Sequence, residues 1–147
     1  MNNEVRTRQN SRSVYQLLRT AVENYGEKTA LTYVKSLGAN HSEETISYTE
    51  LLANIHRAAR LIHELAEPVD GKPPVVSFLL PNIPDAQYVL WGASTVGIAN
   101  PLNSLLSEQA LFGLMEKAGT DILVALGPNP YSDVWEKASA VAQRLTR

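Results

Sequence analysis

Residues 73–103 read PPVVSFLLPNIPDAQYVLWGASTVGIANPLN, and this stretch decides the fold class. Residues 75–80 form a nearly continuous apolar run bounded by prolines, which is typical of a parallel strand buried on both faces. Asn82 stands where it can cap the following helix, and Asp85 lies in the first turn, where negative charge is favoured. The helix is predicted to end at Gly97, before a second strand. The stretch therefore predicts a βαβ unit, and about 98% of such crossovers are right-handed.

The turn between this first strand and the helix reads Pro81-Asn82-Ile83-Pro84 and contains no glycine. Phosphate-binding turns use glycine because it lets backbone amides approach the phosphate closely. We therefore expect the topology of a nucleotide-binding fold without its phosphate-binding turn.

Upstream of this unit, the pattern predicts a helix and a hairpin. Ser13 is placed to cap a helix that ends at Tyr25-Gly26. Two strands at residues 29–34 and 44–48 are predicted to form an antiparallel hairpin with a long loop at residues 35–43.

The helix after the hairpin has the clearest signal in the chain. Ser47 and Glu50 match the capping-box pattern, with Thr49 as a competing cap. The helix is predicted to bury one apolar stripe, made of Leu51, Leu52, Ile55, Ala58, Ala59, Ile62 and Leu65. A proline-rich connection at residues 68–74 then leads into the first parallel strand.

Downstream, Ser107 is placed to cap a further helix and Gly119 to close it. Residues 121–126 are predicted to form a third buried strand, and a last helix starts at Ser132 or Asp133. The apolar sides of these two helices are predicted to be Leu111, Leu114, Met115 and Ala118, and Val134, Ala138, Val141 and Leu145.

These elements predict an α/β fold: a parallel βαβαβ sheet flanked by helices, with an N-terminal helix and an antiparallel hairpin. Residues 1–13 are polar and without periodicity, and we expect them to be a mobile arm. Residues 14–147 are expected to form one α/β subdomain.

Composition excludes several classes of protein. The 147 residues carry a net charge of −2 with mixed signs, so nothing indicates the clustered basic face that binds nucleic acid. No apolar run approaches the roughly 20 residues of a membrane-spanning helix, so no integral membrane segment is expected. The sequence has no cysteine, and the arginine-containing N-terminus lacks the apolar core of a secretory signal. We expect a cytoplasmic protein.

Few residues suggest a reactive site. His56 and His63 lie seven apart on one helix with Arg60 between them, but metal pairs on helices usually need a spacing of three or four, so a solvated flank is favoured. His41 is expected to be solvated. Gly71-Lys72 lacks the rest of a phosphate loop, and a turn into the strand is the better interpretation. No serine sits in a Gly-x-Ser-x-Gly elbow, and no catalytic, cofactor-binding or metal residue is assigned.

The helix within residues 73–103 has two apolar faces. Tyr88, Trp91 and Thr95 recur at helical spacing beside a separate stripe, which contains Ile83, Ala86, Leu90, Ala93 and Gly97. One face covers the sheet. For the other we favour packing on another domain or subunit over a ligand wall, so a homodimer through Tyr88 and Trp91 is one expectation.

Several segments together resemble the start of the AMP-forming acyl-CoA synthetase family of adenylate-forming enzymes. They are residues 46–51, Leu80-Pro81-Asn82, and residues 91–103, 106–111, 118–119 and 122–124. The resemblance implies an incomplete N-terminal subdomain of a larger enzyme. Such an enzyme activates a carboxylic acid, here expected to be a fatty acid, with ATP and Mg²⁺, and transfers the acyl group to coenzyme A.

The family's catalytic segments are a Ser/Thr/Gly-rich loop with a lysine, a Tyr-x-x-Thr-Glu segment, a ribose-binding aspartate and a lysine on a small C-terminal domain. None is present in this sequence, so the fragment alone is expected to be inactive and to hold none of these cofactors. Residues 35–43 and 68–74 look longer than the simplest members need, and Asn100 stands where members often have an apolar residue. A stand-alone α/β binding module or a dimerisation module remain the alternatives.

Overall fold

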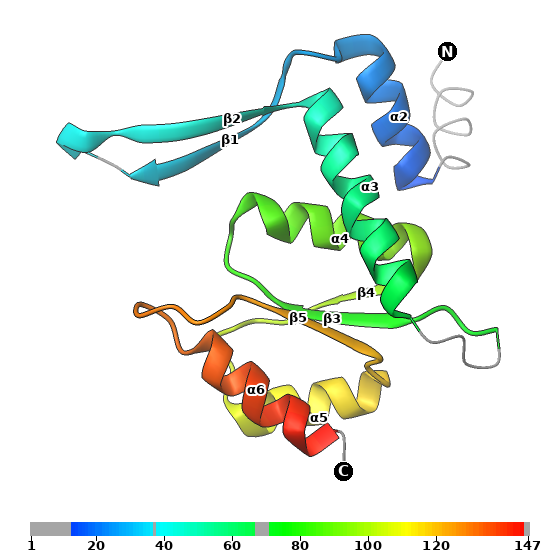
Figure 1. The fold of residues 1–147 in the computed structure, drawn as a ribbon, viewed down its shortest axis with the longest axis vertical. Helices are drawn as coiled ribbons and strands as arrows, with labels where there is room; N and C mark the ends of the chain where they lie inside the picture. Colours follow the sequence, from blue (N-terminus) through cyan, green and yellow to red (C-terminus); the bar gives the residue numbers. More distant parts are fainter. Residues whose placement is uncertain (1–12, 37, 67–70, 146–147) are drawn as a thin grey trace, which may run out of the picture. The chain divides into compact units, whose positions relative to one another are not determined.

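In the computed structural model of the protein, residues 13–36, 38–66 and 71–145 are described. They form two compact units that divide after Asn54, and each is described by itself (Figure 1). Apart from Ser13, the predicted N-terminal arm lies outside the described residues, as does much of the proline-rich connection. No helix of the described ranges is long and apolar enough to cross a lipid bilayer.

The first unit contains α2 (Val14–Tyr25), β1 (Thr29–Ser36), the short 3-10 helix η1 (Gly38–Asn40), β2 (Ser42–Ser47) and the first turns of α3 (Tyr48–Leu65). Ser13 caps α2 as predicted, through a reciprocal pair of hydrogen bonds with Gln16. The antiparallel hairpin is confirmed. Its strands reach further than predicted, to Ser36 and from Ser42, so the loop is shorter than expected.

The start of α3 explains why Tyr48 is helical and not part of the second strand. Ser47 Oγ accepts a hydrogen bond from the Glu50 amide at 3.2 Å, and Glu50 Oε2 accepts one from the Ser47 amide at 2.9 Å. This is the predicted capping box, so Thr49 is not the cap. The hydrogen bonds from the Ser47 backbone and hydroxyl lower the pKa of Glu50. The box thus fixes the point at which strand geometry changes to helix.

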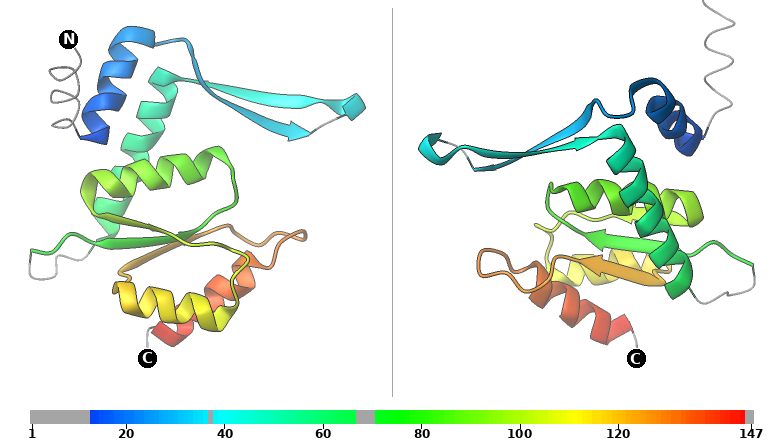
Figure 2. Two further views of the ribbon diagram at one scale, coloured as in Figure 1. Left: turned by 180° about the vertical axis from the view of Figure 1, so that it is seen from behind. Right: turned by 45° about the horizontal axis from the view of Figure 1, so that its top comes forward.

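The second unit contains the rest of α3, β3 (Val75–Leu79), α4 (Pro84–Val96), β4 (Ile98–Pro101), α5 (Glu108–Ala118), β5 (Ile122–Ala125) and α6 (Val134–Leu145). The three strands are parallel in the order β4-β3-β5. After β3 the chain therefore forms β4 on one side of it, and then crosses over β3 to form β5 on the other side. Two crossovers of the same hand that run in opposite directions place their helices on opposite faces of the sheet. Figure 2 shows α4 on one face and α5 on the other.

Each face of the sheet has its own core. On one side, Val76 packs with Ile62 of α3 and Ala93 of α4. On the other, Leu79 packs with a larger cluster from α5 and α6, which contains Leu111, Met115, Val134, Ala138 and Val141. β3 is buried from Val76 to Leu79, as expected for the central strand of a parallel sheet.

A buried polar chain crosses the sheet between these cores. Asn100 Nδ2 donates to Ser77 Oγ at 2.9 Å, Ser77 Oγ lies 2.7 Å from Thr120 Oγ1, and Thr120 Oγ1 donates to the Met115 carbonyl at 3.0 Å. Each hydroxyl has one proton, so the chain has one direction, with Ser77 donating to Thr120. Ser77 is fully buried, and the chain satisfies its hydroxyl as both donor and acceptor.

The predicted cap of α4 is wrong. Ile83 occupies the cap position without a side-chain hydrogen bond, and Pro84 is the first helical residue. Proline disfavours helical geometry at the residue before it, so Ile83 is extended, with φ of −115° and ψ of 162°, and takes the cap position in place of Asn82. The prediction that Asp85 lies in the first turn and that Gly97 follows the helix is confirmed.

Three predicted core positions are also wrong. Leu65 is more than half exposed because the buried stripe of α3 ends at Ile62. Leu114, at 45%, and Ala118 are exposed, while Phe112 packs against the core. The third strand is only half-buried along its length, because it is an edge strand. The predicted caps and inward positions at Ser107, Gly119 and the last helix are confirmed, with Val134, Ala138 and Val141 buried.

Gly92 sets how closely α3 and α4 approach. A methyl group at Gly92 would lie 2.9 Å from both the Ala58 Cβ and the Ala59 amide nitrogen, and 3.1 Å from the Ile55 carbonyl. We predict that Gly92→Ala lowers the free energy of unfolding by about 1–3 kcal/mol through overpacking. Gly113→Ala is the matched control, because it is also in a helix and has nothing within 4 Å. It should stabilise by about 0.5–1 kcal/mol. Urea unfolding measures both, and equal effects of the two changes would contradict this assignment.

Candidate functional site

The carboxyl edge of the sheet is where a fold of this topology binds ligands. In open α/β sheets the crevice lies outside the carboxyl ends of the strands, where the strand order reverses. In the second unit the order reverses at β3, since β4 and β5 lie on its two sides. The loops after the three strands, residues 80–83, 102–107 and 126–133, therefore form the candidate site.

Asparagine side chains shape two of these loops. Asn103 Oδ1 accepts a hydrogen bond from the Leu105 amide at 2.9 Å, and Asn129 Oδ1 accepts one from the Tyr131 amide at 2.9 Å. Both are Asx turns, in which the side chain replaces a backbone acceptor two residues back. Each loop is therefore held locally, before any ligand or partner is present.

Lys137 ties the two loops together. Its Nζ donates to the Ser104 carbonyl at 3.1 Å and forms an ion pair with Asp133 Oδ2 at 2.9 Å. The side chain is mostly buried, at 22% exposed, whereas Asp133 is largely exposed. The ammonium group thus holds the loop after β4 against the start of α6.

The surface at this edge is an open hollow of about 600 Å³ with an apolar and acidic rim. Leu105 and Tyr131 line it and are 87% and 95% exposed, which is unusual for side chains of this size. Asp133 and Glu136 supply two carboxylates and Ser132 a hydroxyl. Ser132 Oγ accepts a hydrogen bond from the Val134 amide. This arrangement provides a contact surface, and none of these groups forms a nucleophile–base pair.

A polyphosphate does not fit the groups present at this edge. The loop after β3 is Pro81-Asn82-Ile83, and the described glycines with positive φ are Gly26, Gly38, Gly71 and Gly119, none of them in the three edge loops. Asp133 and Glu136 would repel phosphate oxygens, and Lys137 is already paired. No three acidic or histidine side chains of the described residues gather as a possible metal site. We therefore derive no chemical step through ATP or Mg²⁺ at this edge.

The residues considered from the sequence lie elsewhere. His56, Arg60 and His63 are exposed on α3, and Arg60 Nε pairs with Glu64 Oε1 at 2.7 Å, which raises the pKa of Arg60. His41 is exposed and contacts Glu43 at 3.2 Å. Gly71 has φ of 70° in a turn and Lys72 is exposed before the amino end of β3, at the opposite edge of the sheet. These positions agree with the interpretation of solvated flanks and a turn.

Comparison with known proteins decides the family. Residues 18–147 match the family described as AMP-binding enzyme. The chain belongs to the AMP-binding enzyme family. The predicted resemblance to AMP-forming acyl-CoA synthetases is thereby confirmed at the level of the family.

One relative is the marinolic acid–CoA ligase of Pseudoalteromonas sp. (strain SANK 73390), which is 35% identical over 126 residues. This alignment covers 86% of our chain and 19% of the ligase, so the chain spans about a fifth of that relative.

Solved structures share the fold. The inhibitor-bound N-terminal domain of FACL13 from Mycobacterium tuberculosis matches with a TM-score of 0.66 at 18% identity, over 90% of our chain and 29% of that chain. The N-terminal subdomain of Klebsiella oxytoca NpsA, in complex with 3-hydroxybenzoyl-AMSN, matches with a TM-score of 0.65 at 17% identity. That match covers 80% of our chain and 28% of the other. The predicted fold class, an incomplete N-terminal part of the adenylate-forming fold, is confirmed.

The sequence pattern missed the residues that build the carboxyl edge. Asn103 and Asn129 follow strands and precede short turns, which is a signal for Asx turns that could have been used. Lys137 could not have been found, because its partner Ser104 lies 33 positions away.

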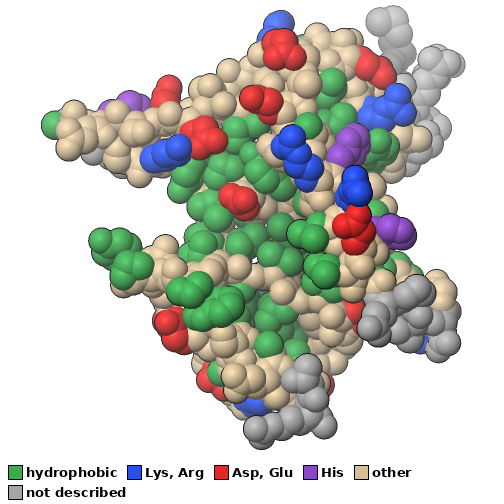
Figure 3. Space-filling model, in the orientation of Figure 1, with side chains coloured by type: hydrophobic (Ala, Val, Ile, Leu, Met, Phe, Trp, Pro, Cys, Tyr) green, Lys and Arg blue, Asp and Glu red, His purple; other side chains and the backbone are tan. Residues whose placement is uncertain are grey.

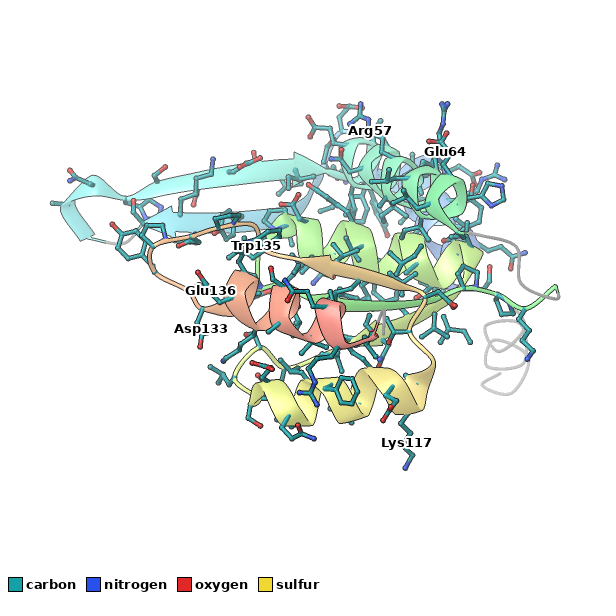
Figure 4. The ribbon with its side chains drawn as sticks, turned by 60° about the horizontal axis from the view of Figure 1, so that its bottom comes forward. Arg57, Glu64, Lys117, Asp133, Trp135 and Glu136 are labelled. Atoms are coloured by element: carbon teal, nitrogen blue, oxygen red, sulfur yellow. The ribbon has the colours of Figure 1, made fainter. Side chains whose placement is uncertain are left out.

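We predict that Lys137→Met loosens the loop after β4. Losing one hydrogen bond is worth about 1 kcal/mol, which corresponds to about fivefold faster hydrogen exchange at residues 103–106. Lys117→Met, at an exposed lysine of α5, is the matched control and should leave this exchange unchanged (Figure 4). Unchanged exchange in Lys137→Met would show that the loop is held by its asparagine turn alone.

Proposed function

We propose that the chain is the N-terminal part of an AMP-forming CoA ligase that activates a carboxylic acid. The observation that carries the proposal is the 35% identity over 86% of the chain to a CoA ligase, within the AMP-binding family. The expected acid is a fatty acid, and the parent enzyme would use ATP and Mg²⁺ to form the acyl-adenylate before transfer to coenzyme A.

The chain contributes structure to this enzyme and does not catalyse adenylation by itself. Adenylation develops negative charge on the triphosphate, so the site must supply donors and cations aimed at it. The carboxyl edge of the second unit has two carboxylates, and its buried lysine is used within the loops. The donors must therefore come from other parts of the polypeptide. We place the parent enzyme in the cytoplasm, a reducing compartment that a chain without cysteine allows.

An ATP–pyrophosphate exchange assay tests both halves of the proposal. The complete polypeptide, expressed from the same reading frame, should exchange pyrophosphate when given a carboxylic acid from a panel of chain lengths. The 147-residue chain should give no exchange above background with any acid. Turnover by the short chain would contradict its assigned role, and an inactive complete polypeptide across the panel would contradict the ligase assignment.

The face of α4 that carries Tyr88 and Trp91 is a second proposed contact, for another domain of the polypeptide or a second copy. Tyr88 and Trp91 lie about one turn apart and are half-buried in the chain. The alternative of a dimerisation module predicts that this face mediates self-association.

Light scattering distinguishes these occupants. If the 147-residue chain is dimeric, Trp91→Ala should shift it to the monomer by removing apolar contact area. Tyr131→Ala removes an aromatic ring from a highly exposed position elsewhere and should leave the mass unchanged. A dimer that survives Trp91→Ala would rule out this face as the interface, and a monomeric native chain would leave the polypeptide's other domains as its occupant.

A further inference from the structure

We draw no further inference here: the strongest candidate, the open hollow at the carboxyl edge of the second unit, where Leu105 and Tyr131 are exposed beside Asp133 and Glu136 and hydrophobic side chains protrude at the loop after β5 (Figure 3), carries nothing because no contact of the described residues shows what covers it.

Discussion

The second unit depends on one buried hydroxyl, Ser77 Oγ, which joins β4, β3 and the start of β5. A buried polar group costs free energy unless it is paired, so the three strands are held in the one arrangement that satisfies Ser77 on both sides. Asn100 approaches from β4 and Thr120 from the turn before β5. Apolar packing alone tolerates small shifts of a parallel strand, but these hydrogen bonds do not. The network therefore fixes register at the centre of the sheet, and the loops at its carboxyl edge inherit that alignment.

Strand order then determines which helices cover each face of the sheet and which loops meet at its carboxyl edge. Because β3 is central and its neighbours follow it in sequence, the helices divide between two faces and the loops after all three strands meet at one edge. At that edge the polar side chains make intramolecular hydrogen bonds: two asparagines close turns, and Lys137 joins the loops. What remains outward is Leu105, Tyr131 and carboxylates. The edge is thus closed by its own hydrogen bonds, and its outward side chains are apolar or acidic, which opposes the binding of phosphate.

Local signals in the sequence predicted most elements. Most errors arose where the structure depends on interactions between residues far apart in the sequence. The capping box at Ser47 and the left-handed Gly119 lie within a few residues of the structures they set, so their positions were predicted correctly. Asn82 is not the cap because Pro84 holds Ile83, the residue before it, in the extended cap position. Leu65 failed because the extent of the core on α3 depends on β3 and α4. Asn100 looked like a departure from the family pattern, yet it supplies the donor that Ser77 needs, 23 positions away. No periodicity in one segment could have shown this.

The candidate site illustrates why topology and chemistry separate in this fold. A strand order that reverses at β3 brings the loops after the three strands to one edge of the sheet, whatever their side chains. The sequence predicted the parallel strands, and the structure supplied their order. Binding a triphosphate needs, in addition, backbone amides freed by glycine or unpaired cations. Here prolines follow β3, and the one lysine at the edge is neutralised by Asp133 at 2.9 Å. Freeing that lysine would remove its hydrogen bond to the Ser104 carbonyl, so the same ammonium group cannot both join the two loops and bind phosphate. Lys137 could therefore either stabilise the edge or bind phosphate, and in this structure its contacts with Ser104 and Asp133 stabilise the edge.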